Sequence, residues 1–343
     1  MRRVVIHKAG GYDQLKLEEF ADPRPKADEV VVRSEAIGVN YADVIIRMGL
    51  YESAKKYVGW PITPGFEFAG RVAVVGEAVA DYAVGDRVFG VSRFFAYASH
   101  VCVPQHQLFP LPSSLSPAEA AAFPSVHLTA YYALFELARP RAKSTILVHS
   151  AAGGVGSALV RMGKIAGCTV VGVVGRSHKV DYARRCGADR VIDKSKDDLW
   201  PAARQAAPHG YQAIFDANGV ATLGQSYAHV APAGRLVIYG FHSMMPKKGG
   251  RPNWLKLAKD YLLTPRFNPL SLTNDNVSVM AFNLSYLFER HDILREAMSE
   301  LIGWLEEGTL APAKIETYSL DDVARAHADI ESGQTVGKLV LTP

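Results

Sequence analysis

Cysteine is scarce in this sequence. Its 343 residues include only Cys102, Cys168 and Cys186, which lie far apart and form no Cys-x-x-Cys pair. A small fold held by disulfides, or a zinc site built from four cysteines, needs more cysteines at closer spacing. Both are therefore excluded, and we expect the three thiols to be small apolar groups in a reducing compartment.

A strong charge of either sign is also missing. The 38 Lys and Arg residues exceed the 34 Asp and Glu residues by only four, and both kinds are spread along the whole length. Nucleic-acid-binding proteins usually carry a concentrated basic surface. We therefore expect no nucleic-acid partner.

Long hydrophobic runs are absent from the start of the sequence. Charged residues such as Arg2, Lys8 and Glu18 interrupt residues 1–30, so neither a signal-peptide core nor a membrane-spanning stretch can be drawn there. We expect a cytoplasmic location and no stable membrane insertion. Because 48% of the residues are hydrophobic, the chain can bury the cores of two domains.

The sequence changes character near Pro124. Before it, apolar runs such as Val30–Val32 and Arg87–Val91 alternate with glycines, which predicts a β-rich domain. After it, strand-like and helical patterns alternate, which predicts an α/β domain with a doubly wound parallel sheet. The strands expected there are Thr145–His149, Thr169–Val174, Arg190–Ile192, Ala213–Asp216 and Arg235–Tyr239.

A proline- and glycine-rich segment, Met244–Asn276, interrupts the α/β pattern. Within it, apolar residues follow helical spacing, and basic residues lie around them. The segment could contact anionic lipid or a partner, or its helix could simply have a solvated face. The apolar residues are Trp254, Leu257, Ala258, Tyr261 and Leu262, and the basic residues are Lys247, Lys248, Arg251, Lys256 and Lys259.

Small residues form a turn between the first strand of the α/β domain and the helical run Ser157–Ala166. Such a turn lets backbone N–H groups approach the pyrophosphate of a dinucleotide, whose charge the helix N-terminus favours. The first glycine of the usual G-x-G-x-x-G pattern is missing, and a glycine-rich turn without a ligand is the alternative. The residues predicted to bind are Ala152, Gly153, Gly154, Val155 and Gly156.

The next strand indicates which dinucleotide binds. NAD sites usually end this strand with an acidic residue, but here it ends in Gly175, Arg176 and Ser177. Arg176, Ser177 and Lys179 suit a 2′-phosphate, and Lys194 after the third strand could join them. We therefore predict NADPH as the cofactor, although each residue alone could be a solvated surface group.

Six short motifs are spread along the sequence: Gly38–Asp43, Gly49–Tyr51, Pro64–Gly70, Gly85–Val88, Ala151–Gly156 and Gly337–Val340. Together they resemble the medium-chain dehydrogenase/reductase family. The resemblance implies a GroES-like catalytic domain, residues 1–123 and 284–343, around a Rossmann NADPH-binding domain, residues 124–283.

The metal ligands of zinc-containing family members have no equivalent in this sequence. The corresponding positions are Asn40, Phe66 and Ser125, and none of these side chains is a good zinc ligand. We expect no metal. The sequence instead resembles the zinc-independent quinone oxidoreductase branch and its vesicle amine transport protein-like members. That resemblance implies hydride transfer to a quinone or an α,β-unsaturated carbonyl.

The resemblance also implies the catalytic residues. Tyr51 is the expected proton donor, and Asn40 and Asp43 would line the same pocket. Water or a cofactor hydroxyl could donate the proton instead, in which case the Tyr51 ring would stack on the substrate. Asp43 could instead have a structural role, as an N-cap or a salt-bridge partner at the start of the helical run Val44–Met48.

Further cofactor contacts rest on the resemblance alone. Many quinone reductases have Tyr where this sequence has Lys194, so the phosphate contact predicted there departs from the common pattern. The remaining residues implied near the nicotinamide and its ribose are Thr129, Asn218, Phe241, Phe282, Asn283, Leu284 and Lys338.

Two other functions remain open at this point. The chain could be an enoyl-thioester reductase, which uses the same hydride chemistry, or a cofactor-binding protein with a structural or membrane-associated role. Family members usually form dimers, and the strand expected near Val277–Phe282 could extend a sheet into a second copy. We therefore expect a homodimer that acts on a small-molecule substrate.

Overall fold

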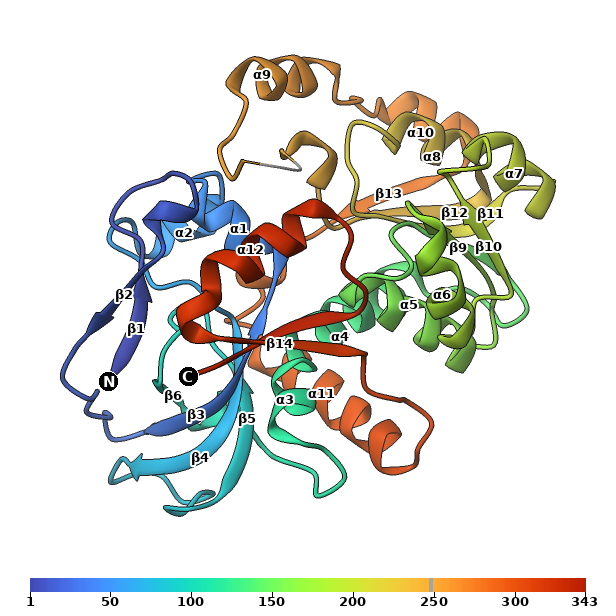
Figure 1. Cartoon of the computed structure of the whole chain (residues 1–343). Helices are drawn as coiled ribbons and strands as arrows, with labels where there is room; N and C mark the ends of the chain where they lie inside the picture. Colours follow the sequence, from blue (N-terminus) through green and yellow to red (C-terminus); the bar gives the residue numbers. More distant parts are fainter. Residues whose placement is uncertain (247–248) are drawn as a thin grey trace. The chain divides into compact units, whose positions relative to one another are not determined.

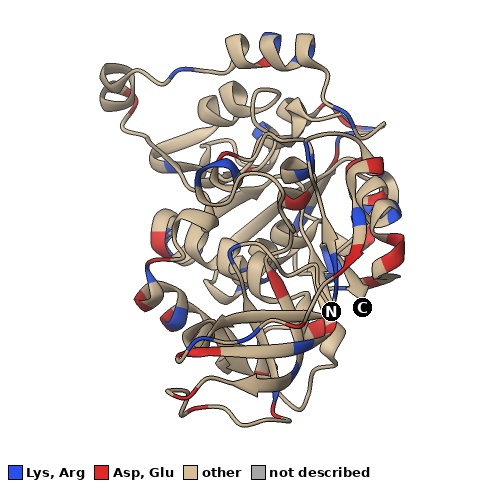
Figure 2. Cartoon of the chain, turned by 90° about the vertical axis from the view of Figure 1, so that its left-hand side faces the viewer, with Lys and Arg blue, Asp and Glu red and all other residues tan. Residues whose placement is uncertain are grey.

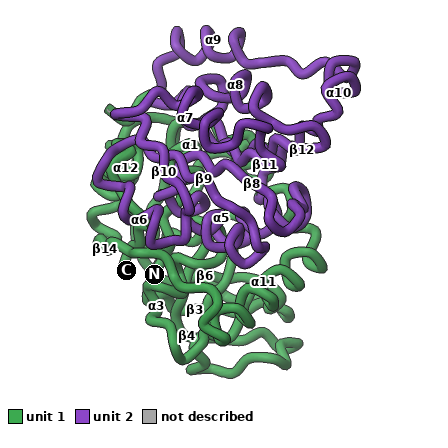
Figure 3. Tube along the Cα trace, turned by 90° about the vertical axis from the view of Figure 1, so that its right-hand side faces the viewer, with its two compact units in different colours: residues 1–125, 247–251, 285–343 green, residues 126–246, 252–284 purple. Residues whose placement is uncertain are grey.

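The computed structural model describes residues 1–246 and 249–343, which form two compact units. Unit 1 comprises residues 1–125, 249–251 and 285–343, and unit 2 comprises residues 126–246 and 252–284 (Figure 3). Helix α4 (Pro124–Tyr131) and the 3-10 turn η6 (Leu284–Tyr286) carry the chain from one unit to the other. The domain limits expected at 123/124 and 283/284 stay predictions.

Unit 1 is built around a seven-stranded sheet. The strand order is β14-β15-β3-β4-β5-β7, and β6 also pairs with β3. Strands β1 and β2 form a separate antiparallel pair. The strands are β1 (Arg2–Val5), β2 (Lys16–Glu19), β3 (Glu29–Val39), β4 (Glu67–Val75), β5 (Arg87–Val91), β6 (His100–Pro104), β7 (Leu108–Pro110), β14 (Ile315–Ser319) and β15 (Lys338–Thr342).

The helices of unit 1 are α1 (Tyr41–Arg47), α2 (Glu52–Tyr57), α3 (Pro117–Ala121), α11 (His291–Glu306) and α12 (Val323–Ser332), with short turns η1 (Tyr12–Gln14), η2 (Gln105–Gln107) and η7 (Leu320–Asp322). Among these helices, α3 packs on β3 and β4, and α12 packs on β14 and β15 (Figure 1). Helix α3 begins at a capping box, in which Ser116 and Glu119 satisfy each other's backbone N–H groups.

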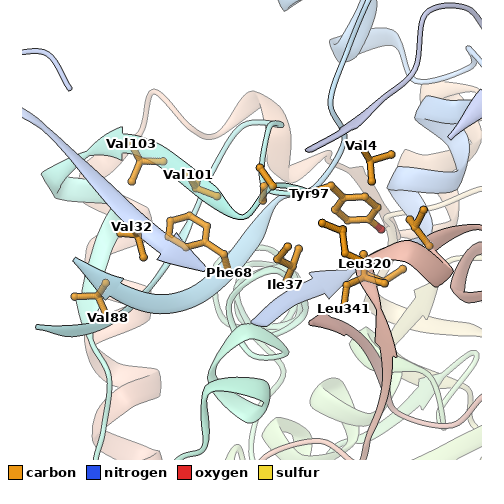
Figure 4. Packing of buried hydrophobic residues seen from close by; sticks show 14 of the residues in the cluster. Val4, Val32, Ile37, Phe68, Val88, Tyr97, Val101, Val103, Leu320 and Leu341 are labelled. Carbon is orange, nitrogen blue, oxygen red and sulfur yellow. The ribbon is translucent and has the colours of Figure 1, made fainter. Parts of the chain in front are cut away.

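The core of unit 1 lies between curved strands. In Figure 4 the ring of Phe68 on β4 points toward Val32 on β3 and Val101 on β6. Leu341 on β15 and Leu320 on η7 belong to the same buried cluster. The C-terminal strand therefore completes a core that the first third of the chain begins.

Unit 2 contains a six-stranded parallel sheet. Its order, β10-β9-β8-β11-β12-β13, runs outward in both directions from β8 and β11, which is the doubly wound order. The strands are β8 (Thr145–Val148), β9 (Thr169–Val174), β10 (Arg190–Asp193), β11 (Tyr211–Asp216), β12 (Val230–Ile238) and β13 (Ser278–Ala281). The predicted α/β fold class is confirmed.

The helices of unit 2 mostly connect consecutive strands. They are α5 (Gly154–Ile165), α6 (Val180–Arg185), α7 (Leu199–Ala206), α8 (Leu223–Ala228), α9 (Trp254–Leu263) and α10 (Pro269–Asp275), with a π-helical stretch η3 (Tyr132–Ala138) and turns η4 (Ser177–Lys179) and η5 (His242–Met244). The helix expected in the basic segment is α9. Lys247 and Lys248 of that segment lie outside the described residues.

Charges of both signs are interspersed over the face that Figure 2 shows, in agreement with the small net charge. Among the described residues, no helix is long and apolar enough to cross a membrane.

Candidate functional site

The carboxyl ends of the six parallel strands bring the predicted cofactor residues to one edge of the unit 2 sheet. Because all six strands run the same way, the segments that follow them meet at that edge. The predicted residues that follow β8, β9, β10, β11, β12 and β13 are, in that order, Ala152–Gly156, Gly175–Ser177 with Lys179, Lys194, Asn218, Phe241 and Phe282–Leu284. Thr129 lies on α4.

The turn between β8 and α5 is tightly packed. Gly153 caps α5 without any side-chain hydrogen bond, so the first N–H groups of the helix have no side-chain cap. A Cβ atom on Gly156 would lie much closer to the carbonyl oxygen of Ser150 than a van der Waals contact allows. Gly156 therefore lets the helix begin directly against the strand, as a pyrophosphate-binding turn requires.

A Gly156→Ala change should weaken NADPH binding at least about tenfold, because the backbone at Ser150 must move to admit the methyl group. Isothermal titration would measure this. Gly303 on α11 has no neighbour within 4 Å of an added Cβ, so Gly303→Ala is the matched control and should leave binding unchanged. Unaltered affinity in Gly156→Ala would show that the turn does not approach the cofactor.

Three cations converge beyond β9 and β10. The side chain of Lys194 lies over Gly175, where an added Cβ would be 3.5 Å from its Cε. Burial, together with the charges of Arg176 and Lys194, lowers the pKa of Lys179 to about 8. Like charges held this close repel one another, so the arrangement favours a bound anion.

Asp193 organises the loop that carries this cluster, and sequence reasoning gave it no role. Its carboxylate accepts hydrogen bonds from the Ser177 hydroxyl (2.6 Å) and from the backbone N–H and hydroxyl of Ser195 (3.0 and 2.6 Å). The Ser177 hydroxyl, predicted to contact phosphate, thus also donates to Asp193. The signal in the sequence for this role of Asp193 was its position as an acidic residue at the end of an apolar strand.

A buried polar network lies where the strand order reverses, between β8 and β11. Asp216 accepts hydrogen bonds from the N–H groups of Asn218 and Gly219 (2.8 and 3.1 Å) and from the hydroxyls of Thr222 and Ser226 (2.7 and 2.8 Å). These bonds fix the turn that carries Asn218, whose Oδ1 accepts from the Ser150 hydroxyl at 3.4 Å.

His149 belongs to the same network. Its Nε2 lies 3.1 Å from Ser226 Oγ and 3.7 Å from Asp216 Oδ2. Burial lowers the pKa of His149 to about 4, although the charge of Asp216 acts in the opposite direction. A neutral His149 therefore joins the turns after β8 and β11. Sequence reasoning missed its partner Asp216, another acid that ends an apolar strand.

Aromatic contacts place two further predicted residues of unit 2. The ring of Phe282, just after β13, lies 4.9 Å from the ring of Tyr132. Phe241 after β12 packs against Gly219 and keeps 42% of its surface exposed. The exposed ring lies beside the turn that holds Asn218.

Unit 1 contains a buried ion pair around Glu67. Lys338 Nζ lies 2.5 Å from Glu67 Oε1 and donates to the Val39 carbonyl and Asn40 Oδ1 at 2.6 and 2.8 Å. Asn40 Nδ2 donates to Glu67 Oε1 (2.8 Å), and the N–H of Ser125 donates to Glu67 Oε2 (2.7 Å). Lys338 and Asn40 are thus both partners of Glu67, which sequence reasoning did not select.

Asp43 caps helix α1 from inside the unit. Its carboxylate accepts from the N–H groups of Asn40 and Gly65, each at 2.8 Å, and from the Tyr97 hydroxyl at 3.1 Å. Burial raises the pKa of Asp43 to about 7, although these hydrogen bonds and the charge of Lys338 act to lower it. Asp43 therefore joins the loops that carry Asn40 and Gly65.

Tyr51 lies in an aromatic cluster of unit 1. Its ring is 5.9 Å from that of Phe66 and 6.4 Å from that of Phe94, with both pairs edge to face. Phe66 and Phe94 are buried, whereas Tyr51 is partly exposed. The cluster holds the Tyr51 ring at the end of an apolar wall.

Comparisons with known proteins cover nearly the whole chain. Residues 26–113 match the alcohol dehydrogenase GroES-like domain family, and residues 186–341 match the zinc-binding dehydrogenase family. The synaptic vesicle membrane protein VAT-1 homolog of Danio rerio is 32% identical over 99% of this chain and 70% of its own length. A quinone oxidoreductase of Pseudomonas aeruginosa is 30% identical over 100% of this chain and 99% of its own.

A solved structure supports the same likeness. Escherichia coli quinone oxidoreductase, determined in complex with NADPH, superposes with a TM-score of 0.86 at 29% identity and covers 100% of both chains. Its architecture is that of the two units described above. The predicted combination of a GroES-like and a Rossmann domain is confirmed.

Proposed function

We propose that this chain, which belongs to the medium-chain dehydrogenase/reductase family, is an NADPH-dependent enzyme. It would reduce a quinone or an α,β-unsaturated carbonyl without zinc. Membership places it among oxidoreductases. The observation that carries the finer proposal is the convergence of Arg176, Lys179 and Lys194 at the carboxyl edge of the unit 2 sheet.

The residues at this edge fit NADPH. The turn Ala152–Gly156 would hold the pyrophosphate, and the three cations would hold the 2′-phosphate. Thr129, Asn218, Phe241 and Phe282–Leu284 would border the nicotinamide and its ribose. When bound, NADPH supplies a hydride from its nicotinamide ring.

The residues at the family's metal position do not fit zinc. Asn40 and Glu67 already bind the buried ammonium of Lys338, and the ring of Phe66 belongs to the aromatic cluster. A fixed cation beside Glu67 would repel Zn²⁺, and a phenyl ring offers no ligand atom. We therefore propose chemistry in which no metal polarises the acceptor.

Tyr51 is the proposed proton donor to the oxygen or carbon that becomes basic after reduction. Phe66 and Phe94 would orient its ring, while Asn40 and Asp43 position the adjoining loops. The nearby apolar wall would suit the carbon skeleton of a quinone or enone.

Tyr51→Phe should lower kcat for an alkenal about 10²-fold and change KM by less than about threefold, because the ring remains and only the acidic hydroxyl is lost. Steady-state kinetics would separate the two constants. Tyr57→Phe, at an exposed ring, is the control. An unchanged kcat would assign Tyr51 to stacking and leave protonation to water.

Cofactor affinity should depend on pH through Lys179. Below a pKa of about 8 its ammonium is charged and attracts the phosphate, whereas above that pKa a proton must be taken up on binding. The Kd for NADPH should therefore rise up to about tenfold between pH 7 and pH 9, with little change for NADH. Lys179→Arg should remove this dependence. Equal pH profiles for both cofactors would contradict the phosphate contact.

The acceptor class can be tested by comparing kcat/KM for 1,4-benzoquinone, an alkenal and an enoyl thioester, each with NADPH. The proposal expects turnover of the first two. Turnover of the thioester alone would identify an enoyl-thioester reductase, and binding of NADPH without any turnover would favour a non-catalytic role.

A homodimer is also proposed, through β13. This strand pairs with β12 and forms one edge of the sheet, so its outer side could pair with a second copy. Light scattering should show a dimer at micromolar concentration, and a monomer there would remove the idea.

A further inference from the structure

Helix α9 in unit 2 presents large apolar side chains to solvent. Five of them, Trp254, Leu255, Tyr261, Leu262 and Leu263, have exposed fractions between 59% and 86%. No residue of the helix is buried. Figure 1 shows α9 on the outer side of its unit, away from the strands of the sheet. Such a concentration of exposed apolar groups indicates a binding surface.

The apolar side chains lie mostly on one side of α9. At about 100° per residue, Trp254, Leu255, Ala258, Tyr261 and Leu262 fall within an arc of about 120°. We call these five residues, with Leu263 beside them, the α9 apolar face. A helix that packs on its own domain turns such a face inward, but here all six residues are exposed.

The polar side of α9 faces the protein. Lys256 Nζ donates to the Ser243 carbonyl at 2.6 Å and forms an ion pair with Asp260, whose side chain is 14% exposed. Leu257, which the sequence groups with the apolar residues, is only partly exposed. Polar contacts hold the inner side of the helix, and the α9 apolar face is left outward.

One contact defines the start of α9, and another ties the segment after it to unit 2. The side chain of Asn253 caps the helix by accepting from the Lys256 N–H at 3.0 Å. After the helix, Phe267 packs on the hydrophobic core, with its ring 5.3 Å from that of Tyr227. The outward apolar face is thus a built feature of unit 2.

Charge identifies what would cover this face. Lys259 and Arg266 are exposed, whereas Asp260, the acid of α9, is paired on the protein side. An anionic lipid surface is complementary to these two exposed cations and would neutralise them. Trp and Tyr also favour the boundary between hydrocarbon and water.

We propose that α9 is a membrane-surface anchor, in which the α9 apolar face enters the headgroup region of an anionic bilayer and Lys259 and Arg266 bind lipid headgroups. Ten residues are too few to span a bilayer, so the helix lies in the plane of the surface. The proposal is independent of the reductase function.

Vesicle flotation of the full chain tests it. Vesicles of phosphatidylcholine mixed with phosphatidylserine should carry the protein, and Leu255→Glu/Leu262→Glu should lower the bound fraction at least about tenfold. Val84→Glu, at an exposed valine of unit 1, is the matched control and should bind like the wild type. Lys259→Glu/Arg266→Glu should lose binding to these vesicles, and high salt should weaken binding of the wild type.

Three results would overturn the anchor. The first is wild-type protein that does not bind the vesicles at low salt, and the second is Leu255→Glu/Leu262→Glu that binds them as well as the wild type does. The third is light scattering that shows a dimer for the wild type and a monomer for this variant, because the face would then bind a second copy. If the glutamate variant fails to fold, Tyr261→Ser/Leu262→Ser replaces it. In each variant, an unchanged Kd for NADPH would show that the dinucleotide site is intact.

Discussion

Replacing both Arg176 and Lys194 with alanine should raise the Kd for NADPH about 100-fold or more and leave the Kd for NADH within about threefold. Each charge-assisted bond to phosphate contributes about 1.5–3 kcal/mol, and about 1.4 kcal/mol corresponds to a factor of ten. NADH lacks the 2′-phosphate, so its binding loses nothing at this site. Relief of the repulsion on Lys179 should also raise the pKa of that residue in the variant.

The control for this experiment removes the same charge elsewhere. Arg184→Ala/Arg185→Ala takes two exposed cations from α6 without touching the cluster. It should change the Kd for NADPH less than about twofold if the effect of the first variant is local and not a consequence of net charge. An equal loss of affinity for NADPH and NADH in Arg176→Ala/Lys194→Ala would place the 2′-phosphate elsewhere.

Lys338→Met should destabilise the protein by about 3–5 kcal/mol, because it leaves the buried carboxylate of Glu67 without its cation. Adding Glu67→Gln should restore part of that loss, since no buried charge remains and the amide of Asn40 can rotate to bind the new amide. Denaturant unfolding of the single and double variants would measure both the loss and the coupling.

Lys26→Met is the matched control, because the side chain of Lys26 is 82% exposed. It should change the unfolding free energy by less than about 0.5 kcal/mol. If Lys338→Met lowers the unfolding free energy as little as this control does, the ion pair does not hold β15 to the rest of unit 1. The proposal that a fixed ammonium beside Glu67 excludes zinc would then lose its support.

Much of unit 2 could be predicted from the sequence because its signals are local. Apolar runs of strand length alternate with helical patterns. For β8, β9 and β10 the predicted first residues are the observed ones, and the predicted last residues lie within one residue of the observed ends. The small-residue turn and the basic residues after β9 are also contiguous in sequence. Local patterns of this kind need no knowledge of distant contacts.

The buried polar partners could not be predicted in the same way. Glu67 and Lys338 meet only because β15 pairs with β3 and β3 pairs with β4. Arg47 and Glu331 form another fully buried pair although 284 residues separate them. The sequence shows each acid in an apolar setting, but the cation that neutralises it depends on the three-dimensional pairing of strands and helices.

The orientation of α9 could not be predicted from the sequence either. Helical spacing of Trp254, Tyr261 and Leu262 predicts an amphipathic helix, but it does not say which side faces the protein. The contact of Lys256 with Ser243 and the low exposure of Asp260 show that the polar side is turned inward.

Cofactor preference and zinc independence are tested together by the initial rate of reduced-cofactor oxidation with 1,4-benzoquinone. The rate is measured with NADPH and with NADH, before and after EDTA treatment. We predict a kcat/KM for NADPH at least about 100-fold above that for NADH, unaffected by EDTA. A preference for NADH, or activity that EDTA removes and added zinc restores, would contradict the account.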